Sequence, residues 1–303
     1  MTKTKLKIQK NVFLAPYTTF DIGGQADFFI KTKNEKEIMA IIQWHREKKL
    51  PLLILGGGSN LLIADQGFRG IVIKIENKKY QINKTEIETE AGLSLAALIK
   101  ISFENNLSGL EPCWGIPGTI GGAIHGNAGT KEQGIGQIIK SVTTVNGAGQ
   151  KQIYSKNDCQ FHYRQSLFQN NQEIILKATF HLRKSSRQEI QNNIKFFKQK
   201  RIAQPTGKSA GSIFKNPSHH SAGHLIDQAG LKGKIIGQAQ ISPKHANFII
   251  NLGQAKSSEV LELIKIAQEV VWRQFQVRLQ PEIALVGFSQ AIKDSIIKSN
   301  QLK

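Results

Sequence analysis

The sequence predicts a folded protein that mixes helices with strands and holds more than one domain. Apolar residues recur at helical spacing over 35–49 and 258–275, which predicts two amphipathic helices. A continuous apolar run at 52–55 and a β-branched run at 173–182 predict buried strands. The chain has 303 residues, and a prior of about 150 residues per domain gives two domains.

The expected elements fall into three units and a tail. The first unit carries the 35–49 helix and strands, the second carries mostly strands, and the third carries the 258–275 helix. The predicted boundaries are 1–77, 78–185, 186–290 and, for a polar tail, 291–303. The expected strands are 52–55, 61–63, 70–75, 82–91, 141–145, 152–154, 173–182, 235–241, 248–251 and 281–286, and the remaining helices are 94–104, 186–201 and 223–229.

Composition excludes several protein classes. Apolar residues make up 40% of the chain and charged residues 21%, as in ordinary globular proteins. A disordered tail, a collagen-like repeat and a disulfide-stapled mini-domain are thereby excluded. Cys113 and Cys159 form neither a CxxC pair nor a zinc pattern, which predicts free thiols in a reducing compartment. With no signal peptide and no transmembrane run, we expect a cytoplasmic protein without membrane insertion.

The formal net charge is +19, and much of it gathers in one stretch. Residues 183–208 hold eight Lys and Arg against one acid, Glu189. A solvated basic face and a nucleic-acid-binding stripe both explain this charge. The stripe would need interleaved aromatics, and Phe196 and Phe197 have instead the helical spacing of a core.

Glycines at the end of the 52–55 strand indicate either an anion site or a plain tight turn. In the sequence GGGSN, backbone amides of Gly56, Gly57, Gly58, Ser59 and Asn60 could line an anion nest. The loop is not a dinucleotide fingerprint, because the third glycine position is occupied by Leu. The triplet Gly-Lys-Ser at 207–209 likewise lacks the first glycine of a phosphate-binding loop.

A second glycine-rich stretch covers 115–129, where six of fifteen residues are Gly. This density argues against a helix and costs entropy to order. A close approach to a large ligand, or glycine packing between sheets, would explain it.

Single polar residues are weaker indicators. Arg164, Ser212 and Glu282 each have an ordinary surface or capping interpretation. The cluster His219, His220 and His224 lacks a carboxylate at ligand spacing, so we expect no metal site.

Taken together, eight segments resemble the UDP-N-acetylenolpyruvoylglucosamine reductase family. They occur in the family's order and cover nearly the whole chain. They are TTFDIGGQAD (18–27), LGGGSNLLIADQGFRGIVI (55–73), GLEPCWGIPGTIGGAIHGNAG (109–129), YRQS (163–166), SAGSIFKNP (209–217), AGHLIDQAGLKG (222–233), ISPKHANFIIN (241–251) and LQPEIALVG (279–287).

The resemblance implies an α+β fold. Its first two units would form a two-part FAD-binding module of the vanillyl-alcohol-oxidase (PCMH) type, and its C-terminal α/β domain would bind the substrate. Residues 56–60 would cradle the FAD pyrophosphate, and the second glycine stretch would flank the flavin. The cofactor-binding residues implied in that stretch are Gly118, Thr119, Gly121, Gly122 and Asn127.

The implied reaction is the NADPH-dependent reduction of UDP-N-acetylglucosamine enolpyruvate to UDP-N-acetylmuramate in peptidoglycan synthesis. Hydride passes from NADPH to FAD and from reduced FAD to the vinyl carbon. Arg164 and Glu282 match the residues that stabilise the enolate, and Ser212 matches the proton donor. The implied substrate-binding residues are Tyr163, Lys215 and Asn216.

Two features distinguish this chain within that family. Only 48 positions separate Arg164 from Ser212, as in the branch that lacks an extra substrate-covering loop. His125 lies where the flavin ring is expected, although the family holds FAD without a covalent bond. We expect a monomer. A different flavin enzyme on the same module, such as an oxidase, and a basic nucleic-acid-binding protein are the alternatives.

Overall fold

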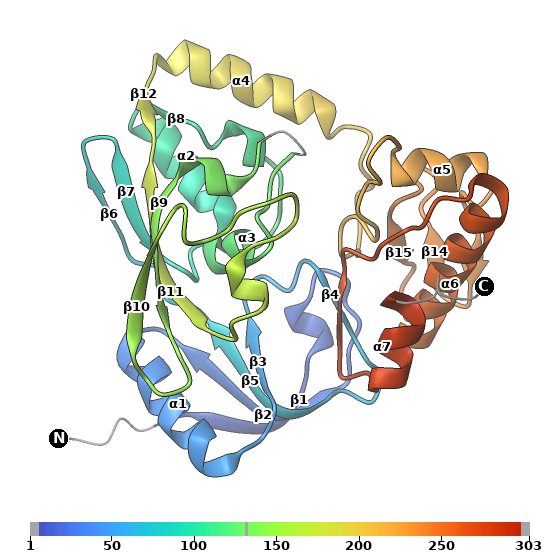
Figure 1. Ribbon diagram of the computed structural model, residues 1–303, viewed down its shortest axis with the longest axis horizontal. Coiled ribbons are helices and arrows are strands. Elements are labelled where there is room, and N and C mark those ends of the chain that lie inside the picture. Colours follow the sequence, from blue (N-terminus) through green and yellow to red (C-terminus); the bar gives the residue numbers. More distant parts are fainter. Residues whose placement is uncertain (1–5, 131–132, 298–303) are drawn as a thin grey trace. The chain divides into compact units, whose positions relative to one another are not determined.

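The computed structural model describes residues 6–130 and 133–297, which form two compact units (Figure 1). Each unit combines segments that are distant in sequence. Unit one contains residues 6–9, 28–57, 70–130 and 133–201, and unit two contains 10–27, 58–69 and 202–297. The domain boundaries expected after residues 77 and 185 stay predictions, and the end of the expected tail, 298–303, lies outside the described residues.

A four-stranded sheet has the strand order β1-β2-β5-β3. Its strands are β1 (Ile8–Phe13), β2 (Gln25–Thr32), β3 (Leu52–Leu55) and β5 (Phe68–Ile75). Strands β3 and β5 are parallel, and Leu55 lies opposite Lys74. Helix α1 (Glu35–Lys48) connects β2 to β3; it begins where the Asn34 side chain accepts a 3.0 Å hydrogen bond from Glu37 N.

A five-stranded antiparallel sheet completes the strands of unit one. Its order is β10-β9-β11-β7-β6, and β11 carries a bulge between Ile175 and Lys177. The strands are β6 (Tyr80–Asn83), β7 (Glu86–Glu90), β9 (Ile139–Val145), β10 (Lys151–Ser155) and β11 (Ile174–His181). Strands β8 (Leu107–Ser108) and β12 (Arg183–Lys184) form a separate two-stranded antiparallel sheet.

The glycine-rich stretch contains a helix, so the expectation that it could not be helical is wrong. Helix α3 (Ile120–His125) follows the Thr119 cap and buries Ile120 and Ile124. Its glycines permit a close approach: a Cβ on Gly121 would lie 3.1 Å from the Cβ of Ala91. Tertiary packing therefore outweighs the low helix propensity of glycine here.

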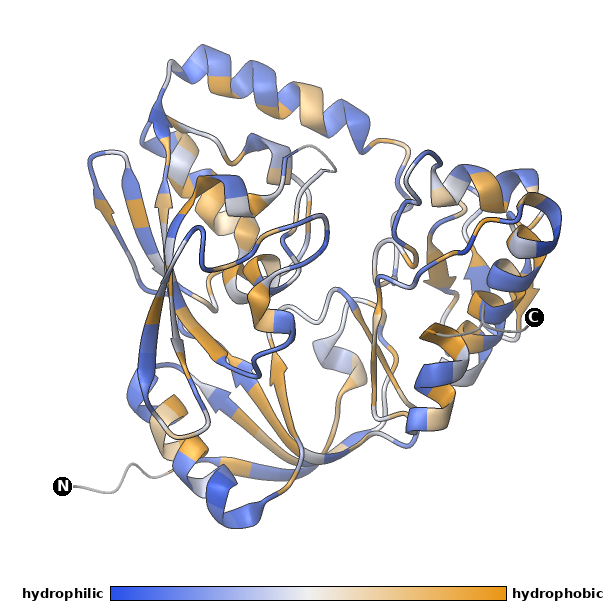
Figure 2. Cartoon of the chain, viewed as in Figure 1, coloured by the Kyte–Doolittle hydropathy of each residue, from blue (hydrophilic) through white to orange (hydrophobic). Residues whose placement is uncertain are grey.

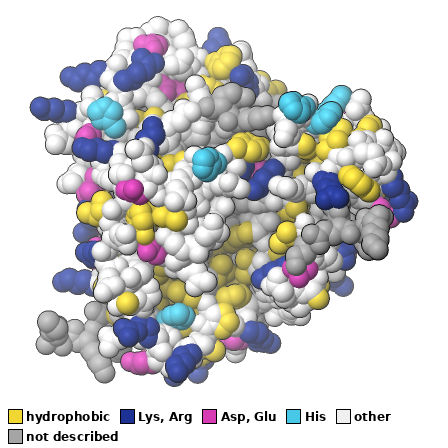
Figure 3. Space-filling view, viewed as in Figure 1, with side chains coloured by type: hydrophobic (Ala, Val, Ile, Leu, Met, Phe, Trp, Pro, Cys, Tyr) yellow, Lys and Arg dark blue, Asp and Glu magenta, His cyan; other side chains and the backbone are white. Residues whose placement is uncertain are grey.

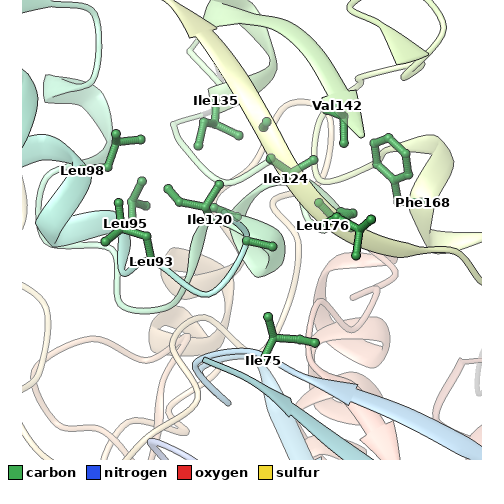
Figure 4. Close-up of a cluster of buried hydrophobic side chains, with 14 of the residues drawn as sticks. Ile75, Leu93, Leu95, Leu98, Ile120, Ile124, Ile135, Val142, Phe168 and Leu176 are labelled. Atoms are coloured by element: carbon green, nitrogen blue, oxygen red, sulfur yellow. The ribbon is translucent and has the colours of Figure 1, made fainter. Parts of the chain in front are cut away.

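The core of unit one lies between its sheets and helices (Figure 4). Helix α2 (Leu95–Glu104) begins after Ser94, whose side chain caps it by accepting a hydrogen bond from Ala97 N. Leu95, Leu98, Ile120, Ile124 and Phe168 pack with residues of β7, β9 and β11 in one cluster. Cys113 and Cys159 are buried free thiols within it, as predicted.

The basic stretch forms helix α4 (Arg187–Lys200), capped by Ser186. Its side chains are mostly hydrophilic (Figure 2). Ile190 is its one buried residue, and Phe196 is 51% exposed, so the expected core role of Phe196 is wrong. On the face drawn in Figure 3, Lys and Arg side chains are scattered and form no continuous stripe.

Unit two combines a three-stranded antiparallel sheet, a parallel strand pair and three helices. The sheet order is β13-β14-β15, and β16 pairs with β4. The strands are β4 (Leu61–Ile63), β13 (Ile235–Ile236), β14 (Ala239–Ile241), β15 (Ile249–Asn251) and β16 (Ala284–Val286), and the helices are α5 (Ala222–Gln228), α6 (Ser257–Phe275) and α7 (Gln290–Ile297). Short 3-10 turns lie at Ala15–Tyr17, Glu111–Cys113, Ile135–Ile138 and Leu167–Gln169 across the two units.

Helix α7 replaces the first part of the expected polar tail. Ile296 is fully buried, and Gln268 of α6 donates a 2.8 Å hydrogen bond to its carbonyl. Apolar residues at helical spacing, Ile292 and Ile296, anchor the segment to the unit two core. In the described part of the chain, no helix is long and apolar enough to cross a bilayer.

We predict that Phe180→Ala lowers the free energy of unfolding by about 3–5 kcal/mol, because it leaves a cavity in a packed core. Phe180 is fully buried on β11, opposite Ile87. Urea denaturation followed by circular dichroism measures the change. Ile153→Ala is the matched control, since Ile153 is 71% exposed on β10, an edge strand of the same sheet. An equal loss in the two variants would contradict the assigned core.

Candidate functional site

In unit one, the two glycine-rich loops meet backbone to backbone. A Cβ on Gly57 would lie 2.5 Å from the Cα of Gly118, and a Cβ on Gly56 would lie 2.4 Å from Thr119 Oγ1. Contacts this short leave no room for a side chain. The structure therefore brings together the loops at 56–57 and 118–122, two segments in which the resemblance implies cofactor-binding residues.

Backbone donors are available in these loops. Within the described residues, no acceptor takes a hydrogen bond from the amides of Gly57, Gly58 or Gly118. Gly58 is buried with φ of 65°, a left-handed conformation that favours glycine. Unused amides of this kind bind anionic groups.

Thr119 and the glycines after it also hold helix α3 in place. Thr119 Oγ1 accepts from Gly122 N at 3.4 Å, and Gly121 N donates to Ala91 O at 2.8 Å. Ile120 N donates to Leu93 O at 2.9 Å. The predicted cofactor residues of this stretch are thus fixed by the end of β7.

Three side chains tie the loop after α3 to the segment that carries Arg164. Asn127 Nδ2 donates to His162 O at 2.7 Å, and Ser166 Oγ donates to His125 O at 2.7 Å. Arg164 Nη1 donates to the carbonyl oxygen of Gly129 at 2.9 Å. Asn127 is buried and left-handed, so it has a structural role beside the predicted cofactor contact.

Arg164 lies half-buried beside Tyr163. Its guanidinium carbon is 5.5 Å from the centre of the Tyr163 ring. Both residues line a cavity of about 540 Å³, together with Lys156, Gln160 and His162. Polar walls and a fixed guanidinium suit an anionic, hydrogen-bonding ligand.

Cys113 does not supply a nucleophile to this region. Its thiol is buried 3.9 Å from Ala128 O. Burial raises the pKa of the Cys113 thiol to about 12, despite the nearby charges of Arg201 and Arg164. The thiolate needed for covalent chemistry is therefore scarce at neutral pH.

In unit two, Asn60 contacts the segment that carries Glu282. Asn60 Nδ2 donates to Glu282 O at 3.0 Å, and Ala284 N donates to Asn60 O at 3.0 Å. Asn60, one of the residues expected to hold the FAD pyrophosphate, therefore also has a structural contact within unit two. Gly58 O accepts from Thr19 N at 3.1 Å, and Ser59 is half-buried.

Ser212 and Glu282 lie on adjacent segments of unit two. Glu282 N donates to Ile213 O at 2.7 Å, and Lys215 N donates to Gln280 O at 2.9 Å. Ser212 also forms a β-bridge with Phe248. Within the described residues, the Ser212 hydroxyl makes no hydrogen bond. Arg164 belongs to unit one.

A buried asparagine missed by the sequence interpretation fixes this serine segment. Asn247 Oδ1 accepts from Phe214 N at 2.9 Å, and Asn247 Nδ2 donates to Phe214 O at 2.8 Å. Its carbonyl accepts from Ile213 N at 2.8 Å. An asparagine between apolar residues, as in HANFII, is the signal that could have found it.

The two predicted substrate residues after Ser212 differ in their contacts. Asn216 Oδ1 accepts from the backbone N of Ala222, the first residue of α5, at 3.0 Å. The Lys215 ammonium is half-exposed and forms no ion pair among the described residues. Lys215 is thus available to an anionic ligand.

Among the residues that the structure describes, no group of three His, Cys, Asp or Glu side chains could hold a metal ion. The candidate residues of unit one are thus the glycine-lined backbone and the Arg164 loop, and those of unit two are the Ser212, Lys215 and Glu282 segments.

Two protein-family models match the chain. The FAD binding domain model matches residues 26–153. The model of the UDP-N-acetylenolpyruvoylglucosamine reductase C-terminal domain matches residues 203–286.

Whole-length relatives are also similar. The UDP-N-acetylenolpyruvoylglucosamine reductase of Carboxydothermus hydrogenoformans is 40% identical, over 95% of this chain and 100% of the relative. That of Chlamydia pneumoniae is 43% identical, over 95% of each. The crystal structure of the reductase from Thermus caldophilus superposes with a TM-score of 0.83 and 33% identity, over 93% of this chain and 100% of that one.

We predict that Gly57→Ala yields protein purified without flavin, because the added Cβ would meet the Gly118 backbone, which cannot move aside cheaply. The flavin absorbance of the purified protein measures the loss. Gly147→Ala is the control, since no heavy atom lies within 4 Å of its added Cβ. Full flavin content in Gly57→Ala would contradict the role given to this contact.

Proposed function

The chain belongs to the UDP-N-acetylenolpyruvoylglucosamine reductase family, and we propose that Arg164, Ser212 and Glu282 are its catalytic residues. It is a UDP-N-acetylmuramate dehydrogenase, an FAD- and NADPH-dependent oxidoreductase of peptidoglycan synthesis. The proposal on the residues is carried by one observation: Glu282 and the Ser212 segment are joined by a 2.7 Å backbone hydrogen bond.

The residues of the glycine loops fit FAD. Positions 56 and 57 exclude side chains, and the Gly57, Gly58 and Gly118 amides have no acceptor within the described chain. In the proposed arrangement, residues 56–60 hold the pyrophosphate, and Gly118–Gly122 with Asn127 flank the flavin. When bound, FAD supplies hydride that it has accepted from NADPH.

Arg164 is suited to bind the carboxylate of the enolpyruvyl group. As hydride reaches the vinyl carbon, negative charge moves onto this carboxylate. A guanidinium is always protonated and forks toward two oxygens. Its hydrogen bond to Gly129 O and its contact with Tyr163 restrict its position before the substrate arrives. Glu282 contributes to the same stabilisation in the proposal.

Ser212 is suited to donate a proton to the carbon next to the one that receives hydride. Its hydroxyl has no hydrogen-bond partner among the described residues, so no protein contact is lost when it turns toward the substrate. The bridge to Phe248 and the Asn247 contacts hold its backbone. Because a serine hydroxyl is a weak acid, a positioned water or a cation must support the transfer.

Substrate binding is proposed for Tyr163, Lys215 and Asn216. Lys215 offers its ammonium to the diphosphate of the UDP-sugar. NADPH carries phosphates too, and the net charge of +19 favours the capture of both polyanions.

We also propose that the chain belongs to the family branch without the extra substrate-covering loop and that it acts in the cytoplasm. Only residues 201–211 lie between α4 and the Ser212 bridge, and this short connection supports the branch without the extra covering loop. Two free buried thiols are consistent with a reducing cytoplasm. The monomeric state stays a prediction.

We predict that Ser212→Ala leaves the reduction of FAD by NADPH nearly unchanged and slows reoxidation by the enolpyruvyl sugar about 10²- to 10⁴-fold, the range of general acid catalysis. Stopped-flow absorbance of the flavin separates the two half-reactions. Each preparation is thus its own control. Equal slowing of both halves would exclude the proton-donor role.

We predict that Arg164→Lys slows the second half-reaction at least about tenfold, because a lysine cannot fork toward two carboxylate oxygens. The reduction by NADPH should change less. Thermal unfolding with bound FAD controls for the lost Gly129 contact. Turnover near that of the unchanged enzyme would remove Arg164 from the proposed trio.

A further inference from the structure

Lys74 lies beneath the first glycine of the predicted cofactor loop. It belongs to β5, opposite Leu55 at the end of the parallel strand β3. Its ammonium donates a hydrogen bond to Gly56 O. The carbonyl of Gly56 is therefore held by a cation from the neighbouring strand, immediately before the amides of Gly57 and Gly58.

The Lys74 ammonium lacks a carboxylate partner. Within the described chain, no Asp or Glu lies within 4.0 Å of it, and the nearby Glu76 pairs with Lys31 at 3.7 Å. The side chain is half-buried, and the Gly56 carbonyl engages only one of its three N–H donors. A partly buried cation left with neutral partners gains most from a bound anion.

Its electrostatic surroundings agree with this geometry. Burial lowers the pKa of Lys74 from 10.5; Glu76 opposes that shift, while Lys31 and Lys78 add to it. The ammonium is thus less stable than in water, and a negative ligand would relieve that cost.

We propose that Lys74 is a positioning and charge-bearing residue for the FAD pyrophosphate. Its ammonium fixes the Gly56 carbonyl on the strand side of the loop, so that the following amides face the ligand. The same charge would attract phosphates bound by those amides. The inference rests on the proposed role of residues 56–60, and it adds to that loop a cation that no glycine pattern includes.

The test is the dissociation of FAD from the holoenzyme. Enzyme saturated with FAD is diluted at several salt concentrations, and free FAD is measured by its fluorescence. We expect Lys74→Met to raise the Kd for FAD about ten- to hundredfold, the range of a charge-assisted hydrogen bond. The dependence of Kd on salt should also become weaker, because a screened charge contact has been removed.

Two further variants separate charge from structure. Lys31→Met removes one positive charge from the same sheet, and its side chain is 43% exposed, so we expect less than about a twofold change in Kd. Lys74→Arg keeps the charge and should retain the salt dependence.

The outcomes that overturn the proposal are distinct. A Lys74→Met protein with unchanged Kd would refute any role. A higher Kd with the original salt dependence would show that Lys74 only shapes the loop. If the unchanged enzyme itself released FAD at all salt concentrations, the proposed FAD loop would fail as well, which separates that failure from the failure of Lys74.

Discussion

The backbone contact between Gly57 and Gly118 is the constraint on which the rest of the site depends. Two loops distant in sequence approach so closely that a single Cβ on Gly57 would lie 2.5 Å from a backbone carbon. Different neighbouring elements hold each loop in place. Strand β3 and Lys74 hold the first loop, and the end of β7 holds the second through Gly121 and Ala91. Ordering so much glycine costs conformational entropy, and these surrounding bonds offset it.

Within each unit, buried side-chain amides fix further loops. Asn127 joins the loop after α3 to the segment of Arg164, and Asn247 joins the Ser212 segment to the residues that precede β15. A buried amide with both donor and acceptor satisfied specifies one backbone arrangement. The charged and hydroxyl-bearing residues of the proposed chemistry can therefore lie on loops and still be well positioned.

Local pattern predicted most elements, and it failed where tertiary contacts decide. The Asn34 and Ser94 caps and the long α6 follow from residues within one or two turns. Helix α3 could not be predicted, because burial of Ile120 and Ile124 against distant strands outweighs its glycines. Strands β1 and β2 were missed as well: β1 is largely exposed, and its apolar residues do not alternate.

The candidate site also contains some residues that local sequence pattern predicts and others that only tertiary contacts bring together. The glycine loops were recognisable because a missing side chain is itself a sequence signal. Ser212 and Glu282, separated by seventy positions, were paired only through the family resemblance. Neither the contact of Asn60 with Glu282 O nor that of Lys74 with Gly56 O leaves a local pattern. Both depend on strand pairing between remote parts of the chain.

The parallel pairing of β4 with β16 has a consequence for how the protein is made. Strand β4 leaves the ribosome long before its partner β16 (Ala284–Val286) is translated. Most of unit one, by contrast, is complete by residue 201. The nascent chain must therefore carry the unpaired edge of β4 until β16 has been made, a period in which such an edge is exposed to wrong partners.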